Sequence, residues 1–305
     1  MVGDNATGTI NAANYNVGLG VDVFASITTA DDNVAIGFEA GKSITNQGDN
    51  VFVGSKAGKS NNTYQSAYIG ARAGENVVGN RGVGIGYLAM QDNIGSTTGD
   101  IGIGFLALQY KNATDGGSIA IGQSAMRGVS NDKATGKYNV AIGQYAMQYY
   151  TSAAQNVAIG KNTLSATTTG AANVAIGHEA LKANTTASNN TAVGQGAAAA
   201  NTTGTLNTAI GYSALDANTT ASNNTAVGGN ALTANTTGTG LVAVGMNALT
   251  ANTTADDNTA LGKGTLGVNT TGASNTGLGR GALGSNTTAD NNTAVGSSAL
   301  TANTT

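Results

Sequence analysis

Residues 207–223 read Asn-Thr-Ala-Ile-Gly-Tyr-Ser-Ala-Leu-Asp-Ala-Asn-Thr-Thr-Ala-Ser-Asn, and residues 224–240 repeat this pattern with few changes. The glycine that closes the opening phrase recurs along the chain, and from Gly143 onward its spacing is 17 residues without exception. A fixed short period is typical of stacked, quasi-one-dimensional architectures. The sequence therefore predicts an all-β parallel β-solenoid with about 17 residues per rung.

The two halves of the chain differ in regularity. Before Gly143 the glycine spacing varies between 16 and 21 residues, and nine of the ten tyrosines precede residue 151. We expect a lead-in at 1–15, irregular tyrosine-rich rungs at 16–143 and regular rungs at 144–305, all in one continuous rod. The motif glycines are Gly20, Gly37, Gly54, Gly70, Gly86, Gly104, Gly122, Gly143, Gly160, Gly177, Gly194, Gly211, Gly228, Gly245, Gly262, Gly279 and Gly296.

Each repeat is predicted to contain a short strand just before its motif glycine. In one repeat the β-branched Val140 and the aliphatic Ile142 flank Ala141, and most other repeats follow the same order. Alternate residues of a strand share a face, so the flanking pair is predicted to be buried and the alanine to lie on the opposite face. The Ala-Leu pair that follows, as in Ala214-Leu215, is predicted to form a second strand or extended segment.

Asparagine is predicted to occupy the corners, because it tolerates left-handed backbone and bonds its own main chain. Identical amides stacked in one register can also bond to one another along the axis. We therefore weigh an amide ladder against a plain turn preference. The candidate ladder consists of Asn184, Asn201, Asn218, Asn235, Asn252, Asn269 and Asn286.

The composition argues against most chemistry. With one histidine and no cysteine, catalytic triads and transition-metal sites have few residues to build on, so we expect no enzyme activity, no catalytic residue, no metal and no cofactor. His178 stands at a variable position after a motif glycine and is expected to be exposed. A net charge of −3 gives no reason to expect nucleic acid as a partner, and no long apolar run suggests membrane insertion.

The phrases Asn139-Val-Ala-Ile-Gly143 and Asn190-Thr-Ala-Val-Gly194 resemble the head repeats of trimeric autotransporter adhesins of the YadA type. They resemble even more closely the Asn-Thr-Ala-Val-Gly arrays of phage tail fibres. The resemblance covers the chain from about residue 16, and the rung here is longer than the usual adhesin repeat. It implies a left-handed β-roll, a side-by-side homotrimer, and an extracellular location on a virion tail fibre or bacterial cell surface.

Three functions remain open from the sequence. The first is a structural shaft of a tail fibre or adhesin that supports host or surface attachment. The second is direct binding of a host glycan or receptor, for which the candidate contacts are Tyr145, Tyr149, Tyr150, Asn131 and Asp132, because tyrosine rings stack on sugars and amides bond hydroxyls. The alternative for the tyrosines is that they pack against a neighbouring chain or fill a tapering end of the solenoid. The third function is ice binding by regularly spaced threonine pairs such as Thr202-Thr203.

Overall fold

The computed structural model describes residues 13–94, 99–112, 116–129 and 134–304. The chain divides into two compact units, Met1–Gln155 and Asn156–Thr305. In the described part of each unit every rung contributes one three-residue strand, and no helix is formed there. Each unit is thus an all-β parallel solenoid, as the 17-residue period predicts.

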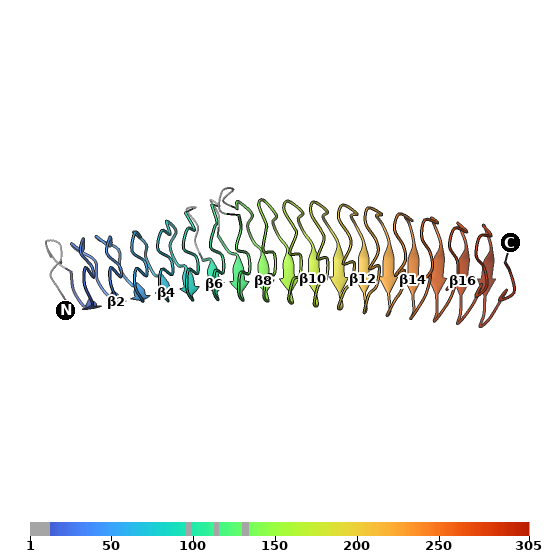
Figure 1. Ribbon diagram of the computed structural model, residues 1–305, viewed down its shortest axis with the longest axis horizontal. Coiled ribbons are helices and arrows are strands. Elements are labelled where there is room, and N and C mark those ends of the chain that lie inside the picture. Colours follow the sequence, from blue (N-terminus) through green and yellow to red (C-terminus); the bar gives the residue numbers. More distant parts are fainter. Residues whose placement is uncertain (1–12, 95–98, 113–115, 130–133, 305) are drawn as a thin grey trace. The chain divides into compact units, whose positions relative to one another are not determined.

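The first unit stacks eight strands within its described residues, and each pairs in parallel and in register with the next (Figure 1, blue to green). They are β1 (Val17–Leu19), β2 (Val34–Ile36), β3 (Val51–Val53), β4 (Ala67–Ile69), β5 (Val83–Ile85), β6 (Ile101–Ile103), β7 (Ile119–Ile121) and β8 (Val140–Ile142).

The second unit stacks nine strands in the same way, again counted over its described residues. They are β9 (Val157–Ile159), β10 (Val174–Ile176), β11 (Thr191–Val193), β12 (Thr208–Ile210), β13 (Thr225–Val227), β14 (Val242–Val244), β15 (Thr259–Leu261), β16 (Thr276–Leu278) and β17 (Thr293–Val295).

The buried face of each strand is the reverse of the predicted one. The central residue points inward, and Ala141 and Ala226 are fully buried, whereas the flanking Ile142 and Ile210 are 36% and 39% exposed. The interior is narrow, and in most rungs a leucine from the opposite wall fills much of it. The strand in these rungs therefore has space for no more than a methyl group on its inner face. The prediction placed the larger side chains inside on hydrophobicity alone.

The predicted second strand is also wrong. After the motif glycine the chain forms a turn in which every second residue takes left-handed backbone, as in Ser213 (φ 48°) and Leu215 (φ 56°). This conformation costs about 1–2 kcal/mol per non-glycine residue. The Leu215 and Leu232 side chains are fully buried, so hydrophobic burial offsets that cost. The Leu positions form the wall of the core that faces the strand alanines.

The motif glycine is required by both backbone angle and space. Gly211 has φ 135°, and a Cβ atom there would lie 2.6 Å from the backbone carbon and oxygen of Gly228 in the next rung. The same close approach recurs between Gly194 and Gly211, where the distance to the oxygen would be 2.3 Å. Each rung can therefore stack on the next only if this corner carries no side chain.

Aromatic residues occupy the strand position of the core where the facing position is glycine. Tyr68 takes the place of the strand alanine, and a Cβ atom on Gly74, at the usual leucine position, would lie 2.5 Å from its ring. Tyr68 also stacks on the Phe52 ring of the preceding rung, with centroids 5.7 Å apart and planes 6° from parallel. The core volume of these rungs is thus conserved by exchanging which wall carries the large side chain.

Candidate functional site

The outer face of the strands is uncharged in both units. In the first unit each strand presents aliphatic residues on this face, such as Ile69 and Ile85, which are 40% and 37% exposed. In the second unit one of the two columns is mostly threonine, as in Thr208, while the other stays aliphatic through Leu261, 44% exposed. No strand residue in the described chain carries a charge. We call this surface the strand face.

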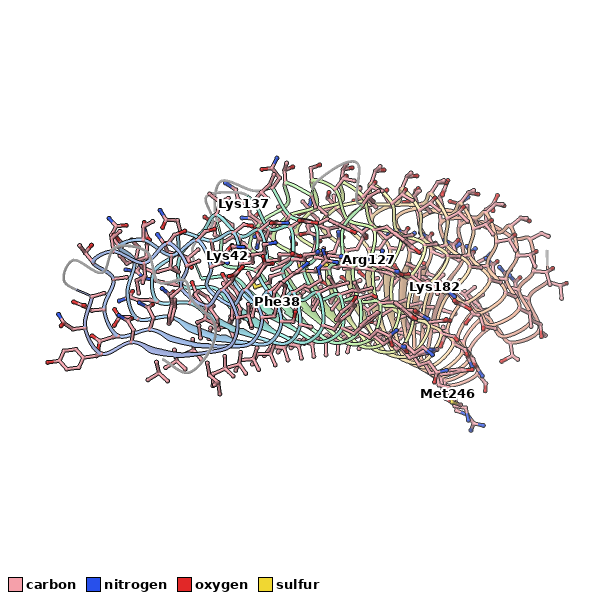
Figure 2. The ribbon with its side chains drawn as sticks, turned by 60° about the vertical axis from the view of Figure 1, so that its left-hand side comes forward. Phe38, Lys42, Arg127, Lys137, Lys182 and Met246 are labelled. Atoms are coloured by element: carbon pink, nitrogen blue, oxygen red, sulfur yellow. The ribbon has the colours of Figure 1, made fainter. Side chains whose placement is uncertain are left out.

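Large apolar side chains also stand at the corner directly after the motif glycine. Phe38 and Met246 occupy this position and are 47% and 46% exposed. Figure 2 shows Met246 projecting away from the second unit. In the first unit Tyr87 and Phe105 of neighbouring rungs stack with ring centroids 5.8 Å apart, and both remain nearly half exposed. The corner is therefore apolar in these rungs, whereas most rungs of the second unit carry a polar or charged residue there, such as Lys161 or Arg280.

The second unit contains a continuous amide ladder at an inner corner. The Nδ2 of Asn218 donates to Oδ1 of Asn201 at 2.8 Å, and Asn201 donates in turn to Asn184 at 3.2 Å. The same bond links Asn235, Asn252, Asn269, Asn286 and Asn303, each to the asparagine one rung before it, at 2.9–3.2 Å. The predicted ladder residues through Asn286 are all buried, so these bonds are formed away from water.

A second asparagine column precedes the strands and bonds the main chain. Oδ1 of Asn190 accepts the backbone N–H of Asn207 at 2.9 Å, and Nδ2 of Asn190 donates to the Gly204 carbonyl at 2.9 Å. Buried backbone groups without partners are costly, so these amides satisfy the corner of each rung. Both columns are thus part of the scaffold.

The threonine pairs divide into a bonded and an exposed member. The hydroxyl of Thr202 donates to the Thr219 carbonyl at 2.9 Å, and that of Thr236 donates to the Thr253 carbonyl at 3.0 Å. The second threonine of a pair, such as Thr203, is exposed. In each of these pairs, therefore, only the second threonine is exposed, while the hydroxyl of the first bonds the next rung.

The structure separates the predicted glycan-contact residues. Tyr149 is 52% exposed and Tyr145 is half-buried. Tyr150 is fully buried, so its prediction as a surface contact is wrong. It stands seven residues after its motif glycine, as the buried Ile44 and Thr167 do in other rungs, so its side chain joins that interior column. Asn131 and Asp132 lie outside the described residues.

The buried Tyr150 hydroxyl has no hydrogen-bond partner within the described structure. Burial raises the pKa of this phenol above its ordinary value, and the negative charge of Asp100 adds to the effect. The group is therefore a neutral filler of the core.

A surface hollow in the first unit is lined by Tyr64, Gln65, Asn80 and Arg81. Tyr64 is 43% exposed, and its backbone N–H donates to Oδ1 of Asn80 at 2.9 Å. Nε of Arg81 donates to Oε1 of Gln65 at 3.1 Å, which links the side chains of the two rungs. These four residues come from two successive rungs and were not singled out from the sequence.

A buried ion pair in the first unit also escaped sequence reasoning. Nζ of Lys111 lies 2.8 Å and 2.9 Å from the two carboxylate oxygens of Asp100, and both side chains are at most 1% exposed. Aligning the rungs would have found the pair, because Asp100 occupies the pre-strand asparagine column and Lys111 the inner-corner column.

A surface network links charged residues of neighbouring rungs in the first unit. Glu39 contacts Lys42 at 2.7 Å and Lys59 at 2.8 Å, and Lys42 also contacts Asp22 at 3.1 Å. Hydrogen bonds from Lys42 and then from Lys59 lower the pKa of Glu39 to about 2 against the smaller opposing effect of burial. Figure 2 labels Lys42 within this unit.

Most of the other titratable side chains in the described part of the chain are spread along the surface, and one of them is the single histidine. His178 is 46% exposed, as expected, and its Nε2 lies 4.0 Å from Glu179. Among the described residues no three His, Cys, Asp or Glu side chains gather closely enough to hold a metal ion. Within that same part of the chain there is no helix with the length and apolarity needed to cross a membrane.

Comparison of the chain with protein-family models, with curated proteins and with solved structures finds no match. The geometry of the strand face, the corners and the core therefore provides the basis for a functional proposal.

Proposed function

We propose that this chain is a structural fibre element, the shaft of a tail fibre or cell-surface adhesin, and that it functions outside the cell as a side-by-side homotrimer that supports surface attachment. The observation that carries the proposal is the strand face. It presents two side chains per rung, without charge and with aliphatic residues in every rung. Contiguous exposed apolar surface of this kind marks interaction sites in soluble proteins.

A second copy of the same chain is the partner that fits this surface best. The strand face repeats at the strand spacing of about 4.8 Å, and another copy offers side chains at the same interval. Identical uncharged faces meet without like-charge repulsion. The asparagine and threonine columns support an elongated stack, because their side chains bond each rung to the next.

The proposal is tested by placing lysine on the strand face. We would combine Ile176→Lys, Ile210→Lys and Leu261→Lys, which are separated along the second unit and are 37–44% exposed. The matched control is Thr186→Lys, Thr220→Lys and Thr271→Lys, which changes three exposed residues of the same unit away from the strands. Circular dichroism first verifies that each variant is folded.

We expect the strand-face variant to have the molar mass of one chain, while the threonine variant keeps the mass of the wild-type assembly. Equal masses for the two variants would count against the strand face as the interface. Electron microscopy of the wild-type protein tests the fibre itself, since we expect an elongated particle, and a globular particle would contradict the proposal.

Glycan binding is the second candidate, favoured by the hollow at Tyr64 and Arg81 and by the exposed Tyr149 ring. Tyr64→Ala and Tyr149→Ala should each weaken binding on a glycan array, whereas Tyr150→Phe should not. Ice binding has less support, because the first hydroxyl of each threonine pair is used within the protein.

A further inference from the structure

The buried cluster around Asp100 and Lys111 contains the components of an amide-forming reaction. Asp100 directly precedes β6, and Lys111 follows the turn after the same strand and forms an isolated parallel bridge with Ala134. The Lys111 Nζ atom contacts both carboxylate oxygens, at 2.8 Å and 2.9 Å, so the amine lies directly against the carboxyl group that it would attack.

Two N–H donors hold the carboxyl group in place. The Asn93 Nδ2 donates to Oδ2 of Asp100 at 3.0 Å, and the backbone N–H of Ser118 donates to Oδ1 at 3.0 Å. The Ser118 hydroxyl lies 3.4 Å from the lysine Nζ. Donors fixed on a carbonyl oxygen stabilise the negative charge that develops there during nucleophilic attack.

The cluster is closed to water. Asp100, Lys111, Asn93 and Ser118 are all at most 1% exposed. Removing two charges from water is costly, and a reaction that ends in an uncharged amide relieves that cost.

We propose that Asp100 and Lys111 condense to an intramolecular isopeptide bond. One proton passes from the Lys111 ammonium to the Asp100 carboxylate, and the Nζ lone pair then attacks Cγ of Asp100. This forms a tetrahedral intermediate whose oxygens are held by Asn93 and Ser118. The C–OH bond then breaks, and the hydroxyl leaves as water with a proton from the nitrogen. One N–C bond forms, one C–O bond breaks, one water is released, and no oxidant or cofactor is needed.

The bond would close one rung of the first unit into a covalent ring. It would join the residue before β6 to the bridge residue beyond the following turn, in the part of the chain where the rung length departs from the regular 17 residues. A cross-link of this kind restricts the unfolded chain.

The decisive experiment is the intact mass of the folded wild-type protein. The proposal predicts a mass lower than that of the sequence by one water molecule. After denaturation and trypsin digestion, cleavage after Lys111 should be blocked, which leaves residues 82–127 joined and lighter by one water. A folded protein with the full mass and normal cleavage after Lys111 would overturn the proposal.

Two controls separate this bond from other dehydrations. A succinimide at Asp115-Gly116 would also remove one water, but trypsin would still cleave after Lys111; that result would count against the proposal. Asp100→Asn should lose ammonia instead of water, because the leaving group becomes the amide nitrogen. Lys111→Arg keeps the charge but has a poor nucleophile, so it should show its full sequence mass.

The role of Asn93 is tested by the rate of bond formation. Asn93→Ala removes one of the two carboxyl donors, and we expect the dehydrated mass to accumulate more slowly than in the wild type. Asn76→Ala is the matched control, since Asn76 bonds Asp92 at 2.7 Å and does not touch the cluster. Equal rates in the two variants would remove Asn93 from the reaction.

Discussion

A Cβ atom on Gly58 would lie 2.6 Å from the Phe52 ring. Phe52 is fully buried at the strand position where most rungs carry alanine, and Gly58 is at the position where most later rungs carry leucine. The two positions therefore share one volume of core, and a large side chain on one side excludes a large side chain on the other.

This shared volume predicts strong coupling between the two sites. Phe52→Ala alone should cost about 3–5 kcal/mol by leaving a cavity. Gly58→Leu alone should be destabilising by about 1–3 kcal/mol from overpacking. The double variant restores the Ala–Leu pair of the regular rungs and should be more stable than the sum of the single effects implies. Urea unfolding of the four proteins measures the coupling, and strict additivity would contradict it.

The amide ladder predicts a large cost for a single interruption. Asn235 donates to Asn218 and to the Gly238 carbonyl and accepts from Asn252, all in the buried corner. Asn235→Ala should lower the free energy of unfolding by about 1–3 kcal/mol for each buried group left without a partner. Thr237→Ala, at an exposed position two residues on, is the control and should change stability little. Comparable losses in both variants would argue against the ladder.

Tyr150 offers a stabilising substitution. Its hydroxyl is buried without a hydrogen-bond partner in the described structure, so Tyr150→Phe removes a desolvated polar group and keeps the ring. We expect the free energy of unfolding to rise by about 1 kcal/mol. Thermal unfolding of both variants measures the change. Tyr149 is 52% exposed, so Tyr149→Phe should leave the stability unchanged. A loss of stability in Tyr150→Phe would show that the hydroxyl is bonded after all.

The ion pairs of Glu39 with its lysine partners predict how the stability of the protein changes at acidic pH. Its lysine partners lower the pKa to about 2 in the folded protein, below the value of an unpaired glutamate. Stabilisation from a lowered carboxyl pKa is present above the unfolded pKa and is lost as the pH falls through the folded value. The difference in melting temperature between wild type and Glu39→Gln should therefore shrink between about pH 4.5 and pH 2. A difference independent of pH would contradict the assignment.

The sequence predicts the period, the parallel solenoid and the positions of the strands seen in the described residues, because one glycine and one aliphatic residue mark each rung. It did not predict which strand face is buried. Hydrophobicity favours burying Ile142 over Ala141, but the interior is too narrow for a large residue on both walls. The pairing of Phe52 with Gly58 and of Tyr68 with Gly74 was the available signal, since a size exchange of this kind occurs only across a packed core.

The candidate site was less predictable than the fold. The ladder asparagines are brought together because they share one register, whereas the tyrosines were chosen by composition alone. Adjacent Tyr149 and Tyr150 point to opposite sides, which residue type cannot reveal. The Asp100–Lys111 pair could be found only by aligning the rungs, which places Asp100 before the strand and Lys111 at the inner corner. The irregular lengths of these rungs make that alignment difficult to see in the sequence.

The proposal depends most on the claim that the strand face is buried between copies of the chain. The molar mass of the wild-type protein, measured by light scattering across a dilution series, tests this directly. We predict a mass of three chains, each of 29.8 kDa, that persists on dilution. A single-chain mass at every concentration would contradict the proposed assembly.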